Sequence, residues 1–420
     1  MRKILDFYKV RFVIILFLTV VVLTSLAWHN RFIWDDPFIS FRYAYNLVHG
    51  NGLVWNVGER VEGYTNFLWT LLMCIPLYLG YGPVTFSLLL GIVFFIFSLV
   101  FTYKTSLLVF HSRDTGLLTI VLLGTNYTFS SFATSGLETQ MQASLFVMSI
   151  YVLFRCIETN DWNTLWLLMS SLLLSAALLT RLDSALLVIV IFPFALFFIL
   201  KDRMPMQQKV KKVLVLLVPF TVLIGGWFIW KLFYYGDILP NTFYVKATNP
   251  SPRLGIDYLY LFFISYLLVP FPFLFILALK RFFKKTNLKM IALIVVILLW
   301  ILYVIKIGGD YMEFRFMVPI MPLLFIVLVW LVFVFIQQKE IRVALILLVL
   351  SGSLHHTFTF GEYTNRKHIV SLDQVVRFNT SRDKTWPMGQ IGMALGRSFH
   401  YSPDVTIALY AVGGIPYYSL

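Results

Sequence analysis

The chain of 420 residues contains a succession of uninterrupted apolar runs, most of them long enough to cross a lipid bilayer as a helix. Hydrophobic residues make up 59% of the sequence and charged residues 13%, with a mean hydropathy of +0.82. A water-soluble core of this size does not absorb so many apolar side chains. The runs are continuous rather than alternating, which argues against a membrane β-barrel. The sequence therefore predicts an all-α polytopic membrane protein.

The formal net charge of +14 is explained by topology. Most Lys and Arg residues lie in short loops between apolar runs, where basic residues orient a chain in the bilayer. No nucleic-acid partner is expected. Cys74 and Cys156 lie inside or at the edge of apolar runs, so neither a disulfide framework nor a thiolate metal site is predicted.

Basic residues precede the first apolar run, which places the N-terminus on the cytoplasmic side. No small-residue cleavage site follows this run, so we interpret it as a retained span. In total we predict about eleven transmembrane helices, at residues 12–29, 83–103, 115–133, 137–155, 164–180, 184–200, 213–233, 256–279, 290–307, 317–336 and 342–356.

One apolar segment, residues 64–80, is left out of this set. If it crossed the bilayer, the two most basic loops, residues 201–212 and 280–289, would face outward, against the positive-inside rule. We therefore predict a re-entrant or interfacial helix at the outer leaflet. Residues 1–356 then form a membrane domain whose first outer loop is 30–82. Residues 357–420 form a short extracytoplasmic C-terminal region, for which we expect a small α/β appendage.

The same topology gathers most acidic residues on the outer face. Carboxylates at outer helix ends, on loops too short to be domains, indicate a polar cavity that opens to the outer compartment. The alternative is that acidic residues simply face away from the basic side. The residues concerned are Asp35, Asp36, Glu59, Glu62, Glu138, Asp183, Asp237, Asp257, Asp310 and Glu313.

The sequence Trp-Asp-Asp-Pro opens a short helix that is predicted to run to about His49. Asp36 is placed to cap its N-terminus, Pro37 suits the first helical position, and Gly50 can adopt the left-handed stop. Asp35 and Asp36 together can hold a divalent cation, Mg²⁺ or Mn²⁺, beside a phosphate, or one of them can take a proton from an attacking hydroxyl. The alternative is a plain helix cap.

Several strings on the predicted outer face carry a recognisable pattern: Asp35–Ala44, His49–Asn56, Glu59–Asn66, Ser135–Thr139, Arg181–Asp183, Gly236–Lys246 and Gly308–Phe316. They resemble the outer loops of polyprenyl-phosphate-sugar-dependent glycosyltransferases of the GT-C superfamily, in particular bacterial homologues of the mycobacterial cell-wall arabinofuranosyltransferases. The resemblance covers nearly the whole chain and implies a helical membrane domain with a juxtamembrane catalytic loop, without fixing the sugar.

The resemblance also implies roles for individual residues. Asp35 and Asp36 match the position of the catalytic acid, as general base or metal ligand, and the two roles are not divided between them. Lys246 and Arg315 are the preferred cations for the leaving phosphate, followed by Arg181. The full set of expected substrate-binding residues is Arg42, His49, Glu62, Tyr64, Asn66, Glu138, Arg181, Asp183, Asn241, Tyr244, Lys246, Asp310 and Arg315.

Structural alternatives stand beside these roles. Glu62 and Asn66 can form an interfacial turn instead of contacting sugar hydroxyls. Arg181 and Asp183 can be a structural ion pair that closes a loop. Lys246 and Arg315 can extend toward the lipid headgroups, as basic residues at helix ends usually do.

The resemblance implies a glycosyltransferase of the bacterial cytoplasmic (inner) membrane. It would transfer a sugar, with a pentofuranose as one candidate, from a polyprenyl-phosphate donor to a hydroxyl of an extracytoplasmic glycan, lipid or protein acceptor. The alternative is a transporter or flippase of a lipid-linked saccharide, which predicts acidic residues near the bilayer midplane and internal repeats. The sequence shows neither feature. A structural scaffold, the third interpretation, gives the one-sided acidic motifs no role.

Overall fold

The computed structural model describes residues 2–247, 251–282, 288–364, 369, 372, 387–398 and 413–419, and these residues form helices and loops without a strand. The expected α/β appendage falls largely on residues outside this description and stays a prediction. The elements, in chain order, are α1 (Arg2–His29), α2 (Pro37–Val48), α3 (Phe67–Tyr78), α4 (Pro83–Phe110), α5 (Arg113–Thr125), α6 (Tyr127–Ser131), η1 (Phe132–Thr134), α7 (Thr139–Thr159), α8 (Thr164–Thr180), η2 (Leu182–Ser184), α9 (Ala185–Lys201), α10 (Met206–Tyr235), α11 (Asn241–Ala247), α12 (Pro252–Ser265), α13 (Pro270–Phe282), α14 (Leu288–Ile307), η3 (Arg315–Ile320), α15 (Met321–Phe335), α16 (Lys339–Thr364), α18 (Pro387–Ser398) and α19 (Gly414–Tyr418).

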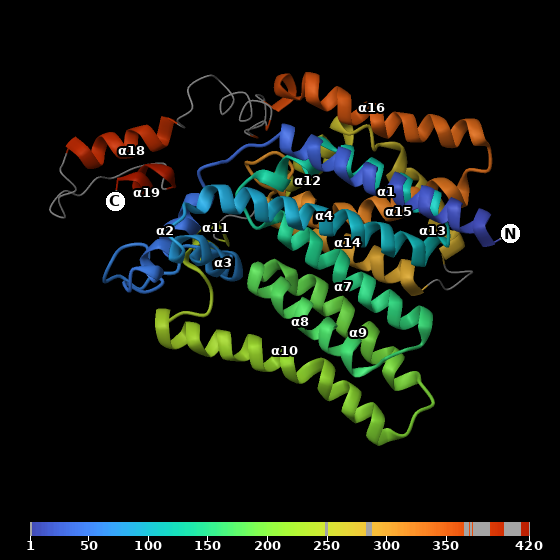
Figure 1. Cartoon of the computed structure of the whole chain (residues 1–420), viewed down its shortest axis with the longest axis horizontal. Helices are drawn as coiled ribbons and strands as arrows, with labels where there is room; N and C mark the ends of the chain where they lie inside the picture. The colour runs from blue at the N-terminus through green and yellow to red at the C-terminus, as the bar shows by residue number, and fades with distance from the viewer. Residues whose placement is uncertain are drawn as a thin grey trace.

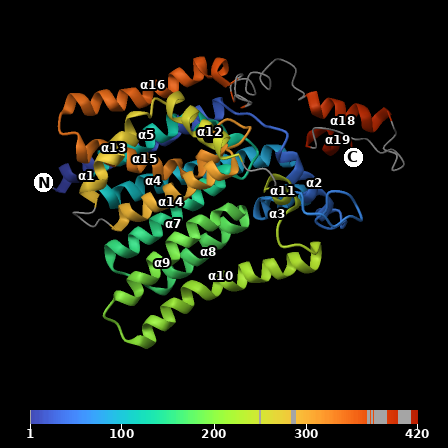
Figure 2. The same ribbon diagram turned by 180° about the vertical axis from the view of Figure 1, so that it is seen from behind.

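The long helices run side by side in a bundle, with α7, α14 and α15 inside it and α1, α10 and α16 at its edges (Figure 1). The short helices α2, α3, α11 and α19 gather at the end of the bundle that lies away from the N-terminus, as both views show (Figure 2). The loops that carry the family-like strings therefore meet at one end of the molecule.

Seven helices among the described residues are long and apolar enough to cross a membrane. Two further pairs pass the same test together but are bent, α5 with α6–η1 by 74° and α12 with α13 by 101°, which gives up to nine spans. The predicted span 164–180 corresponds to α8, an apolar helix of 17 residues, and the predicted span 342–356 lies within α16. The number eleven thus stays a prediction, while the polytopic helical class agrees with the structure.

The segment left out of the predicted spans forms the short helix α3. Its 12 residues rise about 18 Å, too little to cross a hydrocarbon core of about 30 Å. Trp69 and Met73 on α3 are fully buried and pack with Phe38 and Phe41 of α2 in one apolar cluster. The helix is short and docked on α2, in agreement with the prediction that this segment does not span.

Helix α7 brings polar side chains into the bundle. Its residues are buried on nearly every side, and Gln140 and Gln142 are almost inaccessible to solvent. The packing around its start is tight, because a Cβ added to Gly91 of α4 would lie 2.1 Å from the carbonyl oxygen of Ala133. Helix α7 is thus a rigid support whose first turn faces α2 and α3.

Candidate active site

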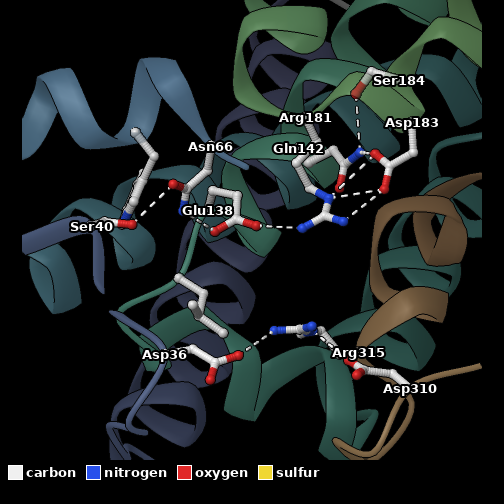
Figure 3. A network of polar contacts seen from close by, with 12 residues as sticks. Asp36, Ser40, Asn66, Glu138, Gln142, Arg181, Asp183, Ser184, Asp310 and Arg315 are labelled. Atoms are coloured by element: carbon white, nitrogen blue, oxygen red, sulfur yellow. Dashed lines mark hydrogen bonds and ion pairs between the residues drawn. The ribbon is translucent and has the colours of Figure 1, made fainter. Parts of the chain in front are cut away.

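Two clusters of carboxylates and arginines lie close together at this end of the bundle (Figure 3). One is built around Arg181, at the end of α8, and the other around Arg315, at the start of η3. Both guanidinium groups lie over the ring of Phe316, with Cζ atoms 5.6 Å (Arg181) and 5.4 Å (Arg315) from its centroid. The two clusters therefore border one polar region.

The Arg181 cluster is closed by hydrogen bonds. Arg181 Nη1 donates to Glu138 Oε1 at 2.7 Å, while Nε and Nη2 donate to Asp183 Oδ2 at 3.0 and 2.8 Å. Gln142 Nε2 donates to Asp183 Oδ1 at 2.6 Å, and Asn66 Nδ2 donates to Glu138 Oε2 at 2.7 Å. The predicted ion pair between Arg181 and Asp183 is present and extends into a network across α3, α7 and α8.

Glu138 ends the loop before α7, so the helix fixes it toward Arg181. Burial, the largest single effect, would raise the pKa of this carboxyl group. The charges of Arg181 and Arg315 and the hydrogen bonds from Arg181 and Asn66 together outweigh burial, so the pKa of Glu138 lies below its ordinary value. Asn66 connects the group to α2, because its Oδ1 accepts from Ser40 Oγ at 2.9 Å. The first outer loop is thereby fastened to the core of the bundle.

The Arg315 cluster is more open. Arg315 Nη1 lies 3.2 Å from Asp36 Oδ2, and Arg315 Nε lies 2.5 Å from Asp310 Oδ2 in an ion pair that is not aligned as a hydrogen bond. Tyr311 donates from its hydroxyl to Asp36 Oδ1 at 2.9 Å and accepts from Trp34 Nε1 at 3.1 Å. The Asp36 side chain is 31% exposed, whereas that of Asp310 is 4% exposed. Solvent thus reaches this cluster at Asp36.

The loop before η3 has an unusual backbone. Gly308 and Gly309 adopt φ values of +88° and +76°, and a Cβ on Gly309 would lie 2.7 Å from the ring of Tyr258. Phe314 is fully buried with φ +45°, a conformation that is costly for a residue with a side chain. This strained turn directly precedes Arg315 and directs it back toward Asp36.

Asp36 corrects one expectation. It occupies the N-cap position of α2, with Pro37 at the first helical position as predicted, but its side chain makes no capping hydrogen bond. Its own backbone is helical (φ −53°, ψ −39°), and its carboxylate is engaged by Arg315 and Tyr311 instead. Gly50 adopts the predicted left-handed conformation after the helix, with φ +81°.

The adjacent Asp35 has different partners. Its Oδ2 accepts from Gly413 N at 2.9 Å and its Oδ1 from Gly414 N at 2.8 Å. Burial raises the pKa of Asp35, and these two N–H groups act in the opposite direction. The carboxylates of Asp35 and Asp36 therefore have different partners in the structure. Among the described residues no group of three or more His, Cys, Asp or Glu side chains is suited to a metal ion. Mg²⁺ or Mn²⁺ binding stays a prediction.

Glu62 and Tyr64 belong to a separate buried cluster. Glu62 Oε2 lies 2.8 Å from the Nζ atom of Lys231, which projects from α10 and is fully buried. Burial raises the pKa of Glu62, although Lys231 counteracts the shift. The Tyr64 hydroxyl lies 3.2 Å from that of Tyr235, also on α10. The structure thus joins Glu62 to α10 through Lys231, whereas Asn66 donates to Glu138.

The remaining residues predicted to bind substrate lie outside the two arginine clusters. Arg42 lies over the ring of Trp55, with its Cζ atom 4.8 Å from the ring centroid, and His49 is exposed. Asn241 donates its backbone N–H to the carbonyl oxygen of Glu62 at 2.9 Å. The exposed Tyr244 donates from its hydroxyl to Asp237. The side chain of Lys246 lies outside the described residues.

Sequence reasoning missed three residues of these clusters. Lys231 lies inside a predicted span, where an ionisable residue is itself a sign of a specific partner. Gln142 follows Glu138 by four residues, so both share one helix face. Tyr311 lay within a family-like string but without a spacing rule that would indicate contact with Asp36.

Comparisons with known proteins place these observations in context. No family model matches the sequence. The terminal β-(1→2)-arabinofuranosyltransferase of Mycobacterium tuberculosis is 46% identical over 57 residues, which are 14% of this chain and 9% of that protein. The protein of the same name from Corynebacterium glutamicum is 27% identical over 335 residues, 72% of this chain and 48% of the relative. The matched region thus spans less than half the length of either relative.

Two solved structures share the arrangement of helices. ArnT from Cupriavidus metallidurans, bound to undecaprenyl phosphate, has a TM-score of 0.61 at 11% identity and covers 97% of this chain and 84% of its own. The oligosaccharyltransferase of Archaeoglobus fulgidus has a TM-score of 0.50 at 12% identity and covers 95% and 59%. The chain therefore shares its fold with ArnT and with the Archaeoglobus fulgidus oligosaccharyltransferase.

Proposed function

We propose that this protein transfers a sugar from a polyprenyl-phosphate donor to a hydroxyl group of an extracytoplasmic glycan, lipid or protein. The observation that carries the proposal is the accessible carboxylate of Asp36 paired with Arg315, at the loop end of a bundle that shares its fold with ArnT. The relatives are named for arabinofuranosyl transfer and one structural neighbour holds undecaprenyl phosphate, which supports a lipid-phosphate donor and a pentofuranose as the sugar.

The arrangement supports the following chemistry. An acceptor hydroxyl attacks the anomeric carbon while Asp36 takes its proton. The bond between that carbon and the phosphate oxygen breaks, and the polyprenyl phosphate leaves with the electron pair. Arg315 binds the charge that develops on the phosphate, for which a guanidinium is suited by its bidentate geometry. No step is assigned to a metal ion.

The Arg181 cluster has a supporting role in this proposal. Asn66 and Glu138 fasten the first outer loop to α7, and Arg181 fastens Glu138 to α8. The loop that carries Asp36 is thereby held against the loop that carries Arg315. A fixed geometry of this kind lowers the cost of organising charged groups during reaction.

The predicted topology supports the extracytoplasmic side of a bacterial cytoplasmic membrane as the location of this chemistry. The basic loops 201–212 and 280–289 are assigned to the cytoplasm and the family-like strings to the opposite side. Cysteine labelling from outside tests this assignment. A cysteine introduced at position 243, an exposed position of α11, should react with the label, whereas a cysteine at position 207 should not. The reverse pattern would overturn the orientation.

Activity is tested with the purified full chain in lipid nanodiscs and a panel of polyprenyl-phosphate pentofuranoses and hexoses. We expect free polyprenyl phosphate and glycosylated acceptor to appear together. Asp36→Asn should lower turnover by about 10²- to 10⁴-fold, because it removes the proton acceptor. Asp161→Asn changes an exposed carboxylate far from the site and serves as the matched control. Full turnover by a folded Asp36→Asn protein would contradict the proposal.

The same purified chain, reconstituted in liposomes instead of nanodiscs, separates transfer from transport. In liposomes that contain labelled lipid-linked saccharide but no acceptor, a flippase moves the label between leaflets, whereas a transferase leaves it in place. Movement of the label without any transfer in the acceptor assay would favour the transporter.

A further inference from the structure

The C-terminal segment 413–419 lies against the start of α2 and holds the carboxylate of Asp35. Gly413 N donates to Oδ2 at 2.9 Å and Gly414 N donates to Oδ1 at 2.8 Å, so each carboxylate oxygen receives one backbone N–H. Hydrogen bonds to an ionised acceptor are stronger than neutral ones, and two of them fix the plane of the carboxylate.

A second anchor of the segment lies about two helical turns after Asp35, on α2. Arg42 on α2 donates from Nη1 to the carbonyl oxygen of Pro416 at 2.7 Å and from Nε to the carbonyl oxygen of Trp55 at 3.0 Å. One guanidinium thus joins the C-terminal segment to the first outer loop. The role of Arg42 that follows from these contacts is attachment of the segment.

Aromatic packing completes the attachment. The rings of Tyr417 and Tyr418 lie 5.4 and 5.5 Å from the ring of Phe38, centroid to centroid, and Tyr417 also lies 6.2 Å from Phe41. Phe38 and Phe41 belong to the buried cluster that also contains residues of α3. The segment therefore packs on the same apolar cluster that docks α3 on α2.

The contact with Asp35 requires glycine. A Cβ added to Gly413 would lie 2.1 Å from the backbone oxygen of Asp35 and 2.5 Å from its carboxyl carbon. The first of these atoms belongs to the backbone at the start of α2 and cannot turn away as a flexible side chain would. Any larger residue at 413 must displace the segment or the start of α2.

We propose that residues 413–419 are a positioning segment of the active site: they hold Asp35, and thereby fix the backbone that directs the adjacent Asp36 toward Arg315. The inference rests on the proposed function and divides the roles of the acidic pair. Asp35 is the positioning residue, since both of its oxygens are occupied by the segment. Asp36 is the catalytic residue, since its own carboxylate is 31% exposed and pairs with Arg315.

The test combines hydrogen–deuterium exchange with turnover on the full chain in nanodiscs. Gly413→Ala disrupts the contact, and Gly82→Ala is the matched control, because a Cβ at Gly82 meets no atom within 4 Å. In the wild type, the hydrogen-bonded backbone N–H groups of Gly413, Gly414 and Tyr417 should exchange slowly. Gly413→Ala should accelerate their exchange and lower turnover at least about tenfold, because the proton acceptor Asp36 is misplaced. The donor KM should stay within about twofold of the wild-type value, because Arg315 is intact.

Two carboxylate variants separate the roles. Asp35→Asn offers one acceptor in place of two, so it should also accelerate exchange at these N–H groups. Asp36→Asn should lower turnover by about 10²- to 10⁴-fold and leave that exchange slow. Unchanged exchange in α7 shows in each variant that the bundle is folded.

Each remaining outcome decides the inference. Fast exchange of the N–H groups of Gly413, Gly414 and Tyr417 in the wild type, or Gly413→Ala behaving as Gly82→Ala does, would overturn it. Fast exchange in Gly413→Ala with normal turnover would overturn the positioning role. If the wild type turned over none of the donors, the proposed function would fail by itself, and slow exchange abolished by Asp35→Asn would still establish the docking of the segment.

Discussion

Arg181 and Arg315 lie over the same aromatic ring but in contrasting surroundings. Arg181 donates hydrogen bonds to Glu138 and Asp183, whose side chains are only 4% and 5% exposed. Arg315 shares one side with the buried Asp310 and the other with Asp36, which is 31% exposed. Arg181 thus has only buried carboxylates as ion-pair partners, whereas Arg315 has one solvent-accessible partner, Asp36, that a ligand can displace.

The difference indicates which arginine can receive a phosphate. If a substrate phosphate displaced a buried, fully hydrogen-bonded carboxylate from its arginine, that carboxylate would remain in the protein as an uncompensated charge, which is strongly unfavourable. Replacing a solvent-accessible carboxylate costs less, because water solvates the displaced group. The contrast favours the structural alternative for Arg181 and the phosphate-binding alternative for Arg315.

The largest expected effect is on stability. Arg181→Met should lower the free energy of unfolding by about 3–5 kcal/mol, because Glu138 and Asp183 remain buried without their cation. Thermal inactivation in detergent measures the loss. Wild-type thermal stability together with a raised donor KM would break the comparison, since Arg181 would then act on substrate.

The same substitution in the other cluster should mainly affect donor binding. Arg315→Met removes the cation that pairs with Asp36, and we expect the donor KM to rise about 10- to 100-fold, the value of a charged hydrogen bond. Its thermal stability should fall less than that of Arg181→Met. An unchanged donor KM, measured at matched protein concentration, would exclude Arg315 from phosphate binding.

A smaller effect is expected from single tyrosine hydroxyls. Tyr311→Phe removes the hydrogen bond to Asp36 and should lower kcat/KM about fivefold, corresponding to about 1 kcal/mol. Tyr303→Phe is the matched control, because its hydroxyl donates to Asp183 in the closed cluster at 3.3 Å. Equal effects of the two substitutions on kcat/KM would remove the distinction between the clusters.

The smallest expected effect is a dependence of stability on pH. The pKa of Glu138 is depressed in the fold, so its contribution is complete above the ordinary value of 4.5 and is lost as pH falls through the depressed value. The pKa of Glu62 is raised, so its contribution is complete below 4.5 and is lost as pH rises through the raised value. Melting temperatures of Glu138→Gln and Glu62→Gln, each compared with the wild type across pH, should therefore diverge in opposite directions.

Much of the architecture was predictable from the sequence because it depends on the apolar pattern and on loop charge. The charge of two basic loops was enough to leave residues 64–80 out of the spans, and α3 is indeed too short to cross. Asp36, Glu138, Arg181 and Arg315 were all selected from the outer segments, and the structure brings their side chains near one another (Figure 3).

The pairing of these residues was not predictable, because it depends on contacts between distant parts of the chain. Local rules gave Asp36 the role of a helix cap, but a cation 279 positions away competes for its carboxylate. Asp35 likewise meets glycines 378 and 379 positions away. Lys231 is recognisable in the sequence as a charged residue within an apolar span, but only the folded chain identifies Glu62 as its partner.

Helix α10 is attached to the first outer loop through Lys231 and Glu62, yet most of its length is exposed at the edge of the bundle. Its 30 residues extend about 45 Å, of which the predicted span, residues 213–233, takes about 32 Å, close to the thickness of a typical hydrocarbon core. A thinner bilayer requires a steeper tilt, which moves the anchored end of the helix relative to the loop. Acyl-chain length in the host membrane is therefore coupled mechanically to the loop that carries the acidic pair.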